Sequence, residues 1–175
     1  KFAGDSPSTL KLILPEAFLE SGDLESRISS INKNMQKYLD EGTLISQGPC
    51  FIYVDRQTSR VKSRKGLVLA VDLEKYDYTI GSRSLIRATE KTVAERLPPR
   101  IKIRENAPLE VPHIQLLIDD PEMTVFSPIE DSISQMEKVY DFDLMMNGGH
   151  IKGYKVSDES LIHKIANSLE QLMDP

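Results

Sequence analysis

The chain contains little of several residue types that define common functional classes. Of its 175 residues, one is cysteine, three are histidine, 6% are aromatic and none is tryptophan. The single cysteine, Cys50, excludes an intrachain disulfide and favours a reducing cytosol. One cysteine with three scattered histidines also argues against a zinc site. Cys50 begins an apolar run and is interpreted as a small core residue in preference to a nucleophile.

Long apolar runs are absent as well. The longest, residues 67–71, is far shorter than the ~20 residues of a membrane-spanning helix, so no such segment is predicted. The composition, 39% hydrophobic and 28% charged, is ordinary for a globular protein. We expect residues 1–175 to form a single α+β domain. Because the chain begins at Lys1 without an initiator methionine, we also expect a fragment of a longer protein.

Charge is segregated along the chain. Residues 81–104 carry seven basic and two acidic side chains, although the net charge of the protein is -5. Residues 105–148 carry ten acidic side chains and one basic side chain. Such segregation attracts an anionic ligand to one surface. A nucleic-acid ligand is disfavoured, because the pI is near 5.3 and the basic segment has no aromatic residue for base stacking.

The spacing of apolar residues predicts an α+β fold with a mixed or antiparallel sheet, a long hairpin and about four flanking helices. Helices are predicted at residues 23–38, 84–97, 129–140 and 161–172, and strands at residues 10–14, 50–55, 66–73, 101–104, 113–118, 143–146 and 151–156. Pro98 and Pro99 are expected to end the second helix, and Ser157 to cap the last one. The basic connection of the 50–73 hairpin is either a solvated turn or a phosphate contact.

The start of the predicted 84–97 helix is the main candidate site. Free backbone N–H groups follow Gly81 there, beside two hydroxyls and two guanidiniums, those of Ser82, Ser84, Arg83 and Arg87. Together these groups would bind a phosphate or a carboxylate. The alternative is structural: a serine caps the helix, and Arg87 pairs along a solvated face.

Other polar residues have weaker signals. Asp119 and Asp120 are either Mg²⁺ ligands at the end of a strand or part of an ordinary Asp-Asp-Pro turn. His113 lies ~20 Å from Asp119 along a straight strand, so the two cannot share a metal. His150 follows two glycines and is a candidate acid–base group without a partner nearby in the sequence. His163 is interpreted as structural or exposed.

Seven short sequence words, in order, identify a family resemblance. They are residues 8–15 (STLKLILP), 81–90 (GSRSLIRATE), 97–100 (LPPR), 106–110 (NAPLE), 117–121 (LIDDP), 140–146 (YDFDLMM) and 148–151 (GGHI). On these words the chain resembles, over nearly its whole length, the bacterial family labelled domain of unknown function 1015.

The resemblance implies a longer protein with a Gly-Asn-His-Ser element beyond the position of Pro175. That element is similar to a loop of the ParB and sulfiredoxin superfamily, whose members bind or cleave nucleotides and include free-serine kinases. Residues 147–150 match a different word and do not replace the element. The resemblance therefore implies that this chain contains at most half of an active site and is inactive alone.

Two main hypotheses follow. In the first, the chain is the nucleotide- or phosphometabolite-binding part of a small-molecule phosphotransferase that uses ATP and Mg²⁺. Glu90 would be catalytic, by orienting Arg87 or taking a proton, and the phosphate-binding residues would be Ser82, Arg83, Ser84, Arg87, Arg100 and Arg104. In the second, the chain is a non-enzymatic regulatory module that docks an acidic partner or forms a homodimer. A DNA-associated regulator of the ParB type is a third, weaker option. Each of them would be cytoplasmic.

Overall fold

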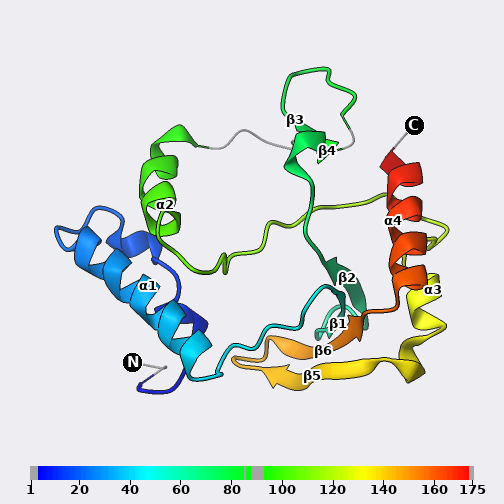
Figure 1. Ribbon diagram of the computed structural model, residues 1–175, viewed down its shortest axis with the longest axis horizontal. Coiled ribbons are helices and arrows are strands. Elements are labelled where there is room, and N and C mark those ends of the chain that lie inside the picture. Colours follow the sequence, from blue (N-terminus) through cyan, green and yellow to red (C-terminus); the bar gives the residue numbers. More distant parts are fainter. Residues whose placement is uncertain (1–3, 85, 88–92, 174–175) are drawn as a thin grey trace. The chain divides into compact units, whose positions relative to one another are not determined.

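The computed structural model describes residues 4–84, 86–87 and 93–173 (Figure 1). These residues form four α-helices, a four-stranded antiparallel sheet and a two-stranded parallel pair, beside short 3-10 turns. The helices are α1 (Leu24–Asp40), α2 (Leu97–Arg104), α3 (Ser127–Glu130) and α4 (Glu159–Met173). The strands are β1 (Phe51–Gln57), β2 (Arg64–Val68), β3 (Tyr76–Asp77), β4 (Ile86–Arg87), β5 (Glu137–Leu144) and β6 (Gly149–Val156). The predicted α+β class, antiparallel sheet and approximate number of helices are confirmed.

Contacts within the chain divide it into two compact units. We call Lys1–Ser46 with Glu90–Leu116 the helical unit, because it contains α1 and α2. Gln47–Thr89 with Leu117–Pro175 is the sheet unit. Each unit has a hydrophobic cluster of its own. The organisation as a single domain stays a prediction.

The helical unit is built on one face of α1. Its buried side chains recur at helical spacing, at Ile28, Ile31, Met35 and Tyr38. Asp23 precedes the helix as predicted, although its carboxylate bonds the Arg27 side chain and caps no backbone N–H. Leu12 packs into the same cluster. So do alternate residues of the chain that follows α2, namely Ala107, Leu109 and Val111, so this segment runs along α1.

The sheet unit has the strand order β2-β1-β6-β5, and α3 and α4 cover one of its faces. Tyr53 of β1 is only 2% exposed. It packs with Val156 of β6, Ile129 of α3 and Ile165 of α4. Burial of these large side chains is the main source of stability in this unit.

The covered face of the sheet becomes charged farther along its strands. Side chains alternate between faces, and directly paired residues share a face. Tyr53 is therefore followed on its face by Asp55, whose partner in β6 is Lys152. Lys152 pairs in turn with Asp141 of β5. The core face thus ends in a row of charged side chains, and this row contains the candidate site.

The helix predicted at residues 84–97 is wrong for the part that the structure describes. Residues 86–87 form β4, which pairs in parallel with β3, and α2 begins only at Leu97. Pro98 and Pro99 lie in the first turn of α2, where proline is tolerated because the first N–H groups of a helix have no intrahelical partner. The prolines therefore begin a helix, and Ile101 belongs to it in place of the predicted strand.

Two further strand predictions are also wrong. Residues 9–11 form a 3-10 turn, in which the hydroxyl of Ser8 accepts a hydrogen bond from the N–H of Leu10. Residues 113–118 form no strand. Apolar runs of this kind become strands only when another strand supplies hydrogen bonds, and the described chain supplies none at either place.

The remaining predictions are mostly confirmed. The β1–β2 hairpin, the helices α1 and α4 and the strand predicted at 151–156 are present. The strand predicted at 143–146 is misplaced, because β5 runs from Glu137 to Leu144 and residues 145–148 form the turn into β6. The helix predicted at 129–140 is shorter, because α3 ends at Glu130 and the β-branched and aromatic residues of β5 begin a strand at Glu137. Asp158, and not Ser157, caps α4 by accepting from the N–H of Leu161.

Candidate acid–base site

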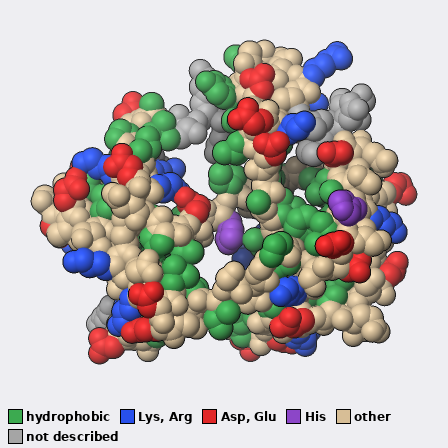
Figure 2. Space-filling view, viewed as in Figure 1, with side chains coloured by type: hydrophobic (Ala, Val, Ile, Leu, Met, Phe, Trp, Pro, Cys, Tyr) green, Lys and Arg blue, Asp and Glu red, His purple; other side chains and the backbone are tan. Residues whose placement is uncertain are grey.

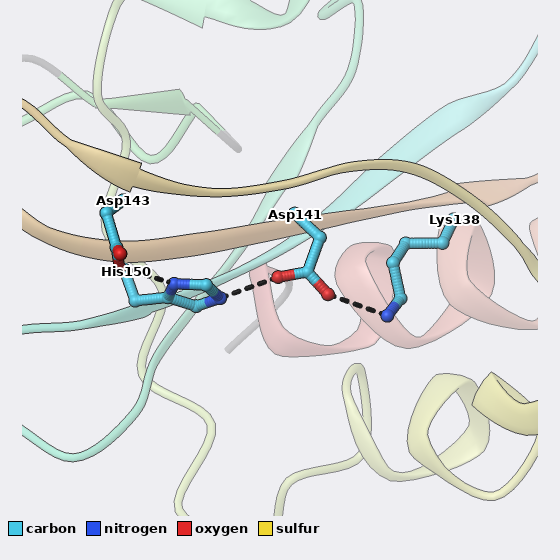
Figure 3. Close-up of polar contacts among 4 residues, drawn as sticks. All are labelled: Lys138, Asp141, Asp143 and His150. Carbon is cyan, nitrogen blue, oxygen red and sulfur yellow. Dashed lines mark hydrogen bonds and ion pairs between the residues drawn. The ribbon is translucent and has the colours of Figure 1, made fainter.

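The β5–β6 hairpin places His150 between two carboxylates. Asp143 is its direct cross-strand partner, and Asp141 lies two residues earlier on the same face of β5. The Nδ1 atom of His150 is 2.8 Å from Asp143 Oδ1, and its Nε2 atom is 2.6 Å from Asp141 Oδ1 (Figure 3). Both ring nitrogens therefore have an acceptor within hydrogen-bonding distance.

Glycine makes this hairpin turn feasible. Gly149 has a φ of +97°, in a region that side-chain-bearing residues rarely adopt. A Cβ atom added there would also overlap the carbonyl oxygen of Gln57 in β1. His150 thus follows a position that requires glycine, and its own backbone is held in the sheet between β1 and β5.

Lys138 extends the cluster at the other side of Asp141. Its Nζ atom is 2.7 Å from Asp141 Oδ2 (Figure 3). Residues three apart on a regular strand face opposite sides. An irregularity in the pairing between Lys138 and Tyr140 shifts the register, so that Lys138 lies on the same face as Asp141.

Each charged group of the cluster stabilises the ionised form of its neighbour. The carboxylates of Asp143 and Asp141 raise the pKa of His150 above its ordinary value. Hydrogen bonds from Lys138 and from His150 hold the pKa of Asp141 below its ordinary value. Ionised carboxylates only accept hydrogen bonds, so this arrangement favours the imidazolium form of His150, in which both ring nitrogens carry a proton.

The two carboxylates differ in exposure. The Asp141 side chain is 32% exposed and is bonded by both Lys138 and His150. The Asp143 side chain is 89% exposed and bonds only His150 among the residues described. A ligand oxygen can therefore replace Asp143 at Nδ1, while Asp141 holds the ring through Nε2. This arrangement, a fixed orienting carboxylate and an accessible second nitrogen, suits general acid–base chemistry.

The residues predicted to bind phosphate in the sheet unit do not open a helix. Gly81 has a φ of +83°, and Ser82–Ser84 lead into β4. The hydroxyl of Ser82 accepts from the N–H of Ser84, whose own hydroxyl donates to the carbonyl of Ile86. Local turn bonds thus involve both hydroxyls, and neither serine caps a helix as the structural alternative had it.

The guanidiniums of this segment are more accessible. Arg83 and Arg87 are exposed, and Arg87 Nε donates to the Ser84 carbonyl at 3.1 Å. A carboxylate lies in the same turn: Asp77 accepts from the N–H of Thr79, and bonds from Thr79 and Ser82 lower its pKa. Figure 2 shows acidic side chains among the basic ones over the β3–β4 segment. The segment is thus less uniformly basic than its sequence suggests.

The other predicted residues lie elsewhere. Arg100 and Arg104 are on α2, in the helical unit. Nε and Nη2 of the Arg104 guanidinium donate to the two carboxylate oxygens of Glu110. Glu90, the predicted catalytic residue, lies outside the described residues. The structure therefore does not bring the predicted set together in one described site.

The aspartates considered for Mg²⁺ have a structural role at least in part. The Asp120 carboxylate accepts from the N–H groups of Thr124 and Val125 and from the Thr124 hydroxyl. This is the turn alternative. Within the described ranges no group of three or more His, Cys, Asp and Glu side chains is arranged to hold a metal.

Comparison with known proteins identifies the family. The family model described as protein of unknown function, DUF1015, matches residues 1–174. The chain belongs to the DUF1015 family. No curated protein and no solved structure matches it. Across the described part of this DUF1015 chain, every helix is too short or too polar to cross a bilayer.

The sequence indicates no partner for His150, but in the structure two of the family's sequence words lie side by side at this residue. The words at residues 140–146 and 148–151, by which the chain resembles other DUF1015 proteins, form the two sides of one hairpin. The signal that would have found the site is the spacing Asp141-x-Asp143, which places both carboxylates on one face of a strand, followed by a two-glycine turn and His150.

Proposed function

We propose that this DUF1015 protein is part of a small-molecule phosphotransferase in which His150 exchanges a proton with a substrate hydroxyl. The observation that carries the proposal is the imidazole held by Asp141 through Nε2, with an exposed and replaceable partner, Asp143, at Nδ1. The two carboxylates raise the pKa of His150, which favours the protonated ring that can donate a proton to a departing oxygen.

The proton transfers follow from this geometry. When a phosphate monoester is cleaved, the P–O bond breaks, the Nδ1 proton passes to the departing alkoxide, and the phosphoryl group passes to an acceptor. In the reverse direction the neutral ring takes the proton of the hydroxyl as its oxygen attacks phosphorus. Asp141 keeps the ring oriented in both directions, and its own Lys138 partner keeps it ionised.

The phosphate-binding part of the proposal rests on the exposed guanidiniums. Arg83 and Arg87 would hold the phosphate oxygens, with Ser82 and Ser84 as local turn formers and Glu90 orienting Arg87. Arg100 and Arg104 belong to the helical unit and are not part of this proposed set. ATP is the proposed phosphoryl donor. Mg²⁺ would accompany it, because phosphoryl transfer depends on neutralising the charge of the phosphate oxygens. The single cysteine makes the cytoplasm the proposed compartment.

Calorimetric titration of ATP with Mg²⁺ into the protein tests this function. The wild-type protein should bind saturably, and Arg87→Ala should weaken binding by about tenfold or more. His150→Gln should bind ATP as the wild type does. In a preparation whose wild type transfers phosphoryl groups to added hydroxyl compounds such as serine and glycerol, ³¹P NMR should show loss of that transfer in His150→Gln. Undiminished phosphoryl transfer in His150→Gln would contradict the acid–base role of His150. Undiminished ATP affinity in Arg87→Ala would contradict the phosphate-binding role of Arg87.

A second candidate function, a docking module, has an observation of its own. Residues 113–118 form neither a helix nor a strand, and the side chains of Ile114 and Leu117 are 85% and 84% exposed. Exposed apolar side chains in an extended segment are typical of surfaces that bind another protein chain. Light scattering distinguishes self-association from the enzyme proposal: a homodimer that Leu117→Lys dissociates, without ATP binding, would favour docking.

A further inference from the structure

The four-stranded sheet has a second face, opposite the one that α3 and α4 cover. Alternation along the strands places Val54, Ile151 and Phe142 on this second face and Tyr53 on the covered one. Of the residues described, neither hydrophobic cluster includes Val54, Ile151 or Phe142. The Phe142 side chain is 49% exposed, and a Cβ atom added to Gly66, on the same face, would meet nothing within 4 Å. We call this surface the open face.

The strands sort their charged side chains between the two faces. Asp55, Asp141 and Asp143 belong to the covered face. Within the four described strands, the charged side chains of the open face are those of Arg56, Arg64, Lys155 and Glu137. The open face is therefore basic, although the net charge of the protein is -5. A local surplus of positive charge attracts a polyanion against the overall sign.

One row across the open face joins an aromatic ring to two guanidiniums. Phe142 of β5 pairs with Ile151 of β6. On the other side of Ile151 lies Arg56 of β1, whose partner in β2 is Arg64. Neighbouring strands are about 4.8 Å apart, so the backbones of the two arginines lie about 10 and 14 Å from that of Phe142.

The two arginines of this row have no carboxylate to neutralise them. Neither Arg56 nor Arg64 forms an ion pair with a carboxylate of the described ranges. The Nη2 atom of Arg56 donates to the Gly148 carbonyl at 2.8 Å, which fixes this side chain without changing its charge. Like charges directly opposite each other in a sheet are destabilising. An anion that approaches the exposed Arg64 would offset this repulsion.

The aromatic end of the row offers a surface for stacking. The ring centroids of Phe142 and Tyr140 are 5.9 Å apart, and the Tyr140 ring covers Gly153. Nucleobases stack on exposed aromatic rings with little regard to sequence, because every base has a π-face. The sequence disfavours a nucleic-acid ligand because residues 81–104 lack an aromatic side chain. The open face differs, since it brings together aromatic and basic side chains that are far apart in the sequence.

We infer that the open face binds single-stranded nucleic acid, with a base stacked on Phe142 and phosphate groups at Arg64 and Arg56. Four-stranded sheets that carry aromatic side chains bind single-stranded RNA in this way. Arg60 and Lys62, both exposed in the connection between β1 and β2, extend the basic end of the row. An acidic peptide would match the charge but would leave the Phe142 ring unused.

Fluorescence anisotropy of the whole chain with labelled oligonucleotides of about eight nucleotides tests this inference. Saturable binding of an oligo-uridine or an oligo-thymidine, weakened by salt, is expected, and the tighter of the two identifies RNA or DNA as the ligand. Phe142→Ala should weaken binding by about fivefold or more, the loss of one stacked base, and leave the salt dependence unchanged. Arg64→Ala should reduce the slope of log affinity against log salt concentration by about 0.7, the loss of one phosphate contact.

Two further variants are controls. Phe142→Leu keeps an apolar side chain without the ring, so it should lose affinity as Phe142→Ala does if stacking, and not a folding defect, is the cause. Tyr78→Ala removes an aromatic side chain that is 79% exposed but lies outside the four-stranded sheet, and it should leave the affinity unchanged.

The inference fails if neither oligonucleotide binds at about 1 mM. It also fails if Phe142→Leu or Arg64→Ala binds as the wild type does, or if Tyr78→Ala loses as much affinity as Phe142→Ala. Equal competition by oligoglutamate or by duplex DNA would overturn it as well, because charge alone would then explain the binding. Arg87→Ala should leave oligonucleotide binding unchanged, so this result is independent of the proposed phosphotransfer.

Discussion

Asp143 and His150 are direct cross-strand partners in the β5–β6 hairpin, with Oδ1 and Nδ1 2.8 Å apart. On the other side of the ring, Asp141 is closer to Nε2, at 2.6 Å, and is also bonded by Lys138. The two aspartates thus have separate roles. Asp141 fixes the ring, whereas Asp143 supplies a charge that solvent or a ligand can replace.

This relationship predicts how His150 titrates. Asp143→Asn removes one carboxylate charge and should lower the pKa of His150 while leaving the ring oriented by Asp141. Asp141→Asn should also lower this pKa and, in addition, free the ring and Lys138. Both are measured from the ring ¹H and ¹³C shifts of His150 across pH. An unchanged pKa in Asp143→Asn would show that the hydrogen bond to Asp143 does not persist in solution.

Folding stability should follow the same titration. The pKa of His150 is raised in the folded state, so the folded protein binds the proton more tightly than the unfolded chain does. Its stabilising contribution is fully present below the unfolded pKa, about 6.5, and is lost as the pH rises through the folded pKa. Urea unfolding on both sides of this window should show this loss in the wild type, and His150→Gln should lack it.

The sequence predicts the parts of the fold that local patterns determine. The helices α1 and α4 have strong apolar stripes, and β6 is a β-rich run directly after Gly148 and Gly149. The prediction misses most of its partner β5, because the first residues of β5 continue the apolar spacing of the helix predicted at 129–140. The helix predicted at residues 84–97 is wrong because the prediction uses apolar spacing and takes Pro98 and Pro99 as the end of a helix. Proline is favourable in the first turn of a helix, and these two residues begin α2. The strand predicted at residues 113–118 is wrong because a strand forms only beside a second strand, and the local sequence does not specify which segment that would be.

The candidate site could be predicted only in part. The pairing of Asp143 with His150 follows from a short turn, but Lys138 reaches Asp141 because of a register irregularity that no local pattern indicates. The basic run at 81–104 is contiguous in sequence, yet Arg87 and Arg104 belong to different units. A run of like charges in the sequence therefore predicts a charged surface only where the residues of the run belong to the same helix or strand.

A third prediction concerns the link between α3 and the sheet. The hydroxyl of Tyr53 donates to Glu130 Oε1 at 2.7 Å, and Lys65 pairs with the same carboxylate. Tyr53→Phe removes a hydrogen bond to a charged acceptor and should lower the free energy of unfolding by about 1.5 kcal/mol. The value lies at the low end of the usual range because Glu130 keeps Lys65 and is itself partly exposed.

Tyr154→Phe is the control for this change, and urea unfolding measures both. Tyr154 is the cross-strand partner of Tyr53, and among the described residues its hydroxyl has no hydrogen-bond partner. Its replacement should change the free energy of unfolding by less than about 0.5 kcal/mol. Equal losses in the two variants would mean that the Tyr53–Glu130 bond contributes no net stability.

A fourth prediction uses two glycines that pair with the same residue. Val54 of β1 lies between Gly66 of β2 and Gly153 of β6. A Cβ atom at Gly153 would overlap the ring of Tyr140, whereas one at Gly66 would meet nothing within 4 Å. Gly153→Ala must displace the ring and should destabilise the protein by about 1–3 kcal/mol. Gly66→Ala should stabilise it by up to about 1 kcal/mol, because alanine suits a strand interior better than glycine.

The two substitutions should change the free energy of unfolding in opposite directions. Because the backbone preference for alanine over glycine is the same at both strand positions, the difference between them reports the overlap with the Tyr140 ring. If the ring of Tyr140 causes the loss, Gly153→Ala should become harmless in a Tyr140→Ala background, and a double-mutant cycle measures that coupling. Tyr140 lies in β5 between Lys138 and Asp141, so displacement of its ring should also disturb the register irregularity that aligns these two residues. A lowered pKa of His150 in Gly153→Ala would then show that ring packing on one face of the sheet maintains the acid–base cluster on the other.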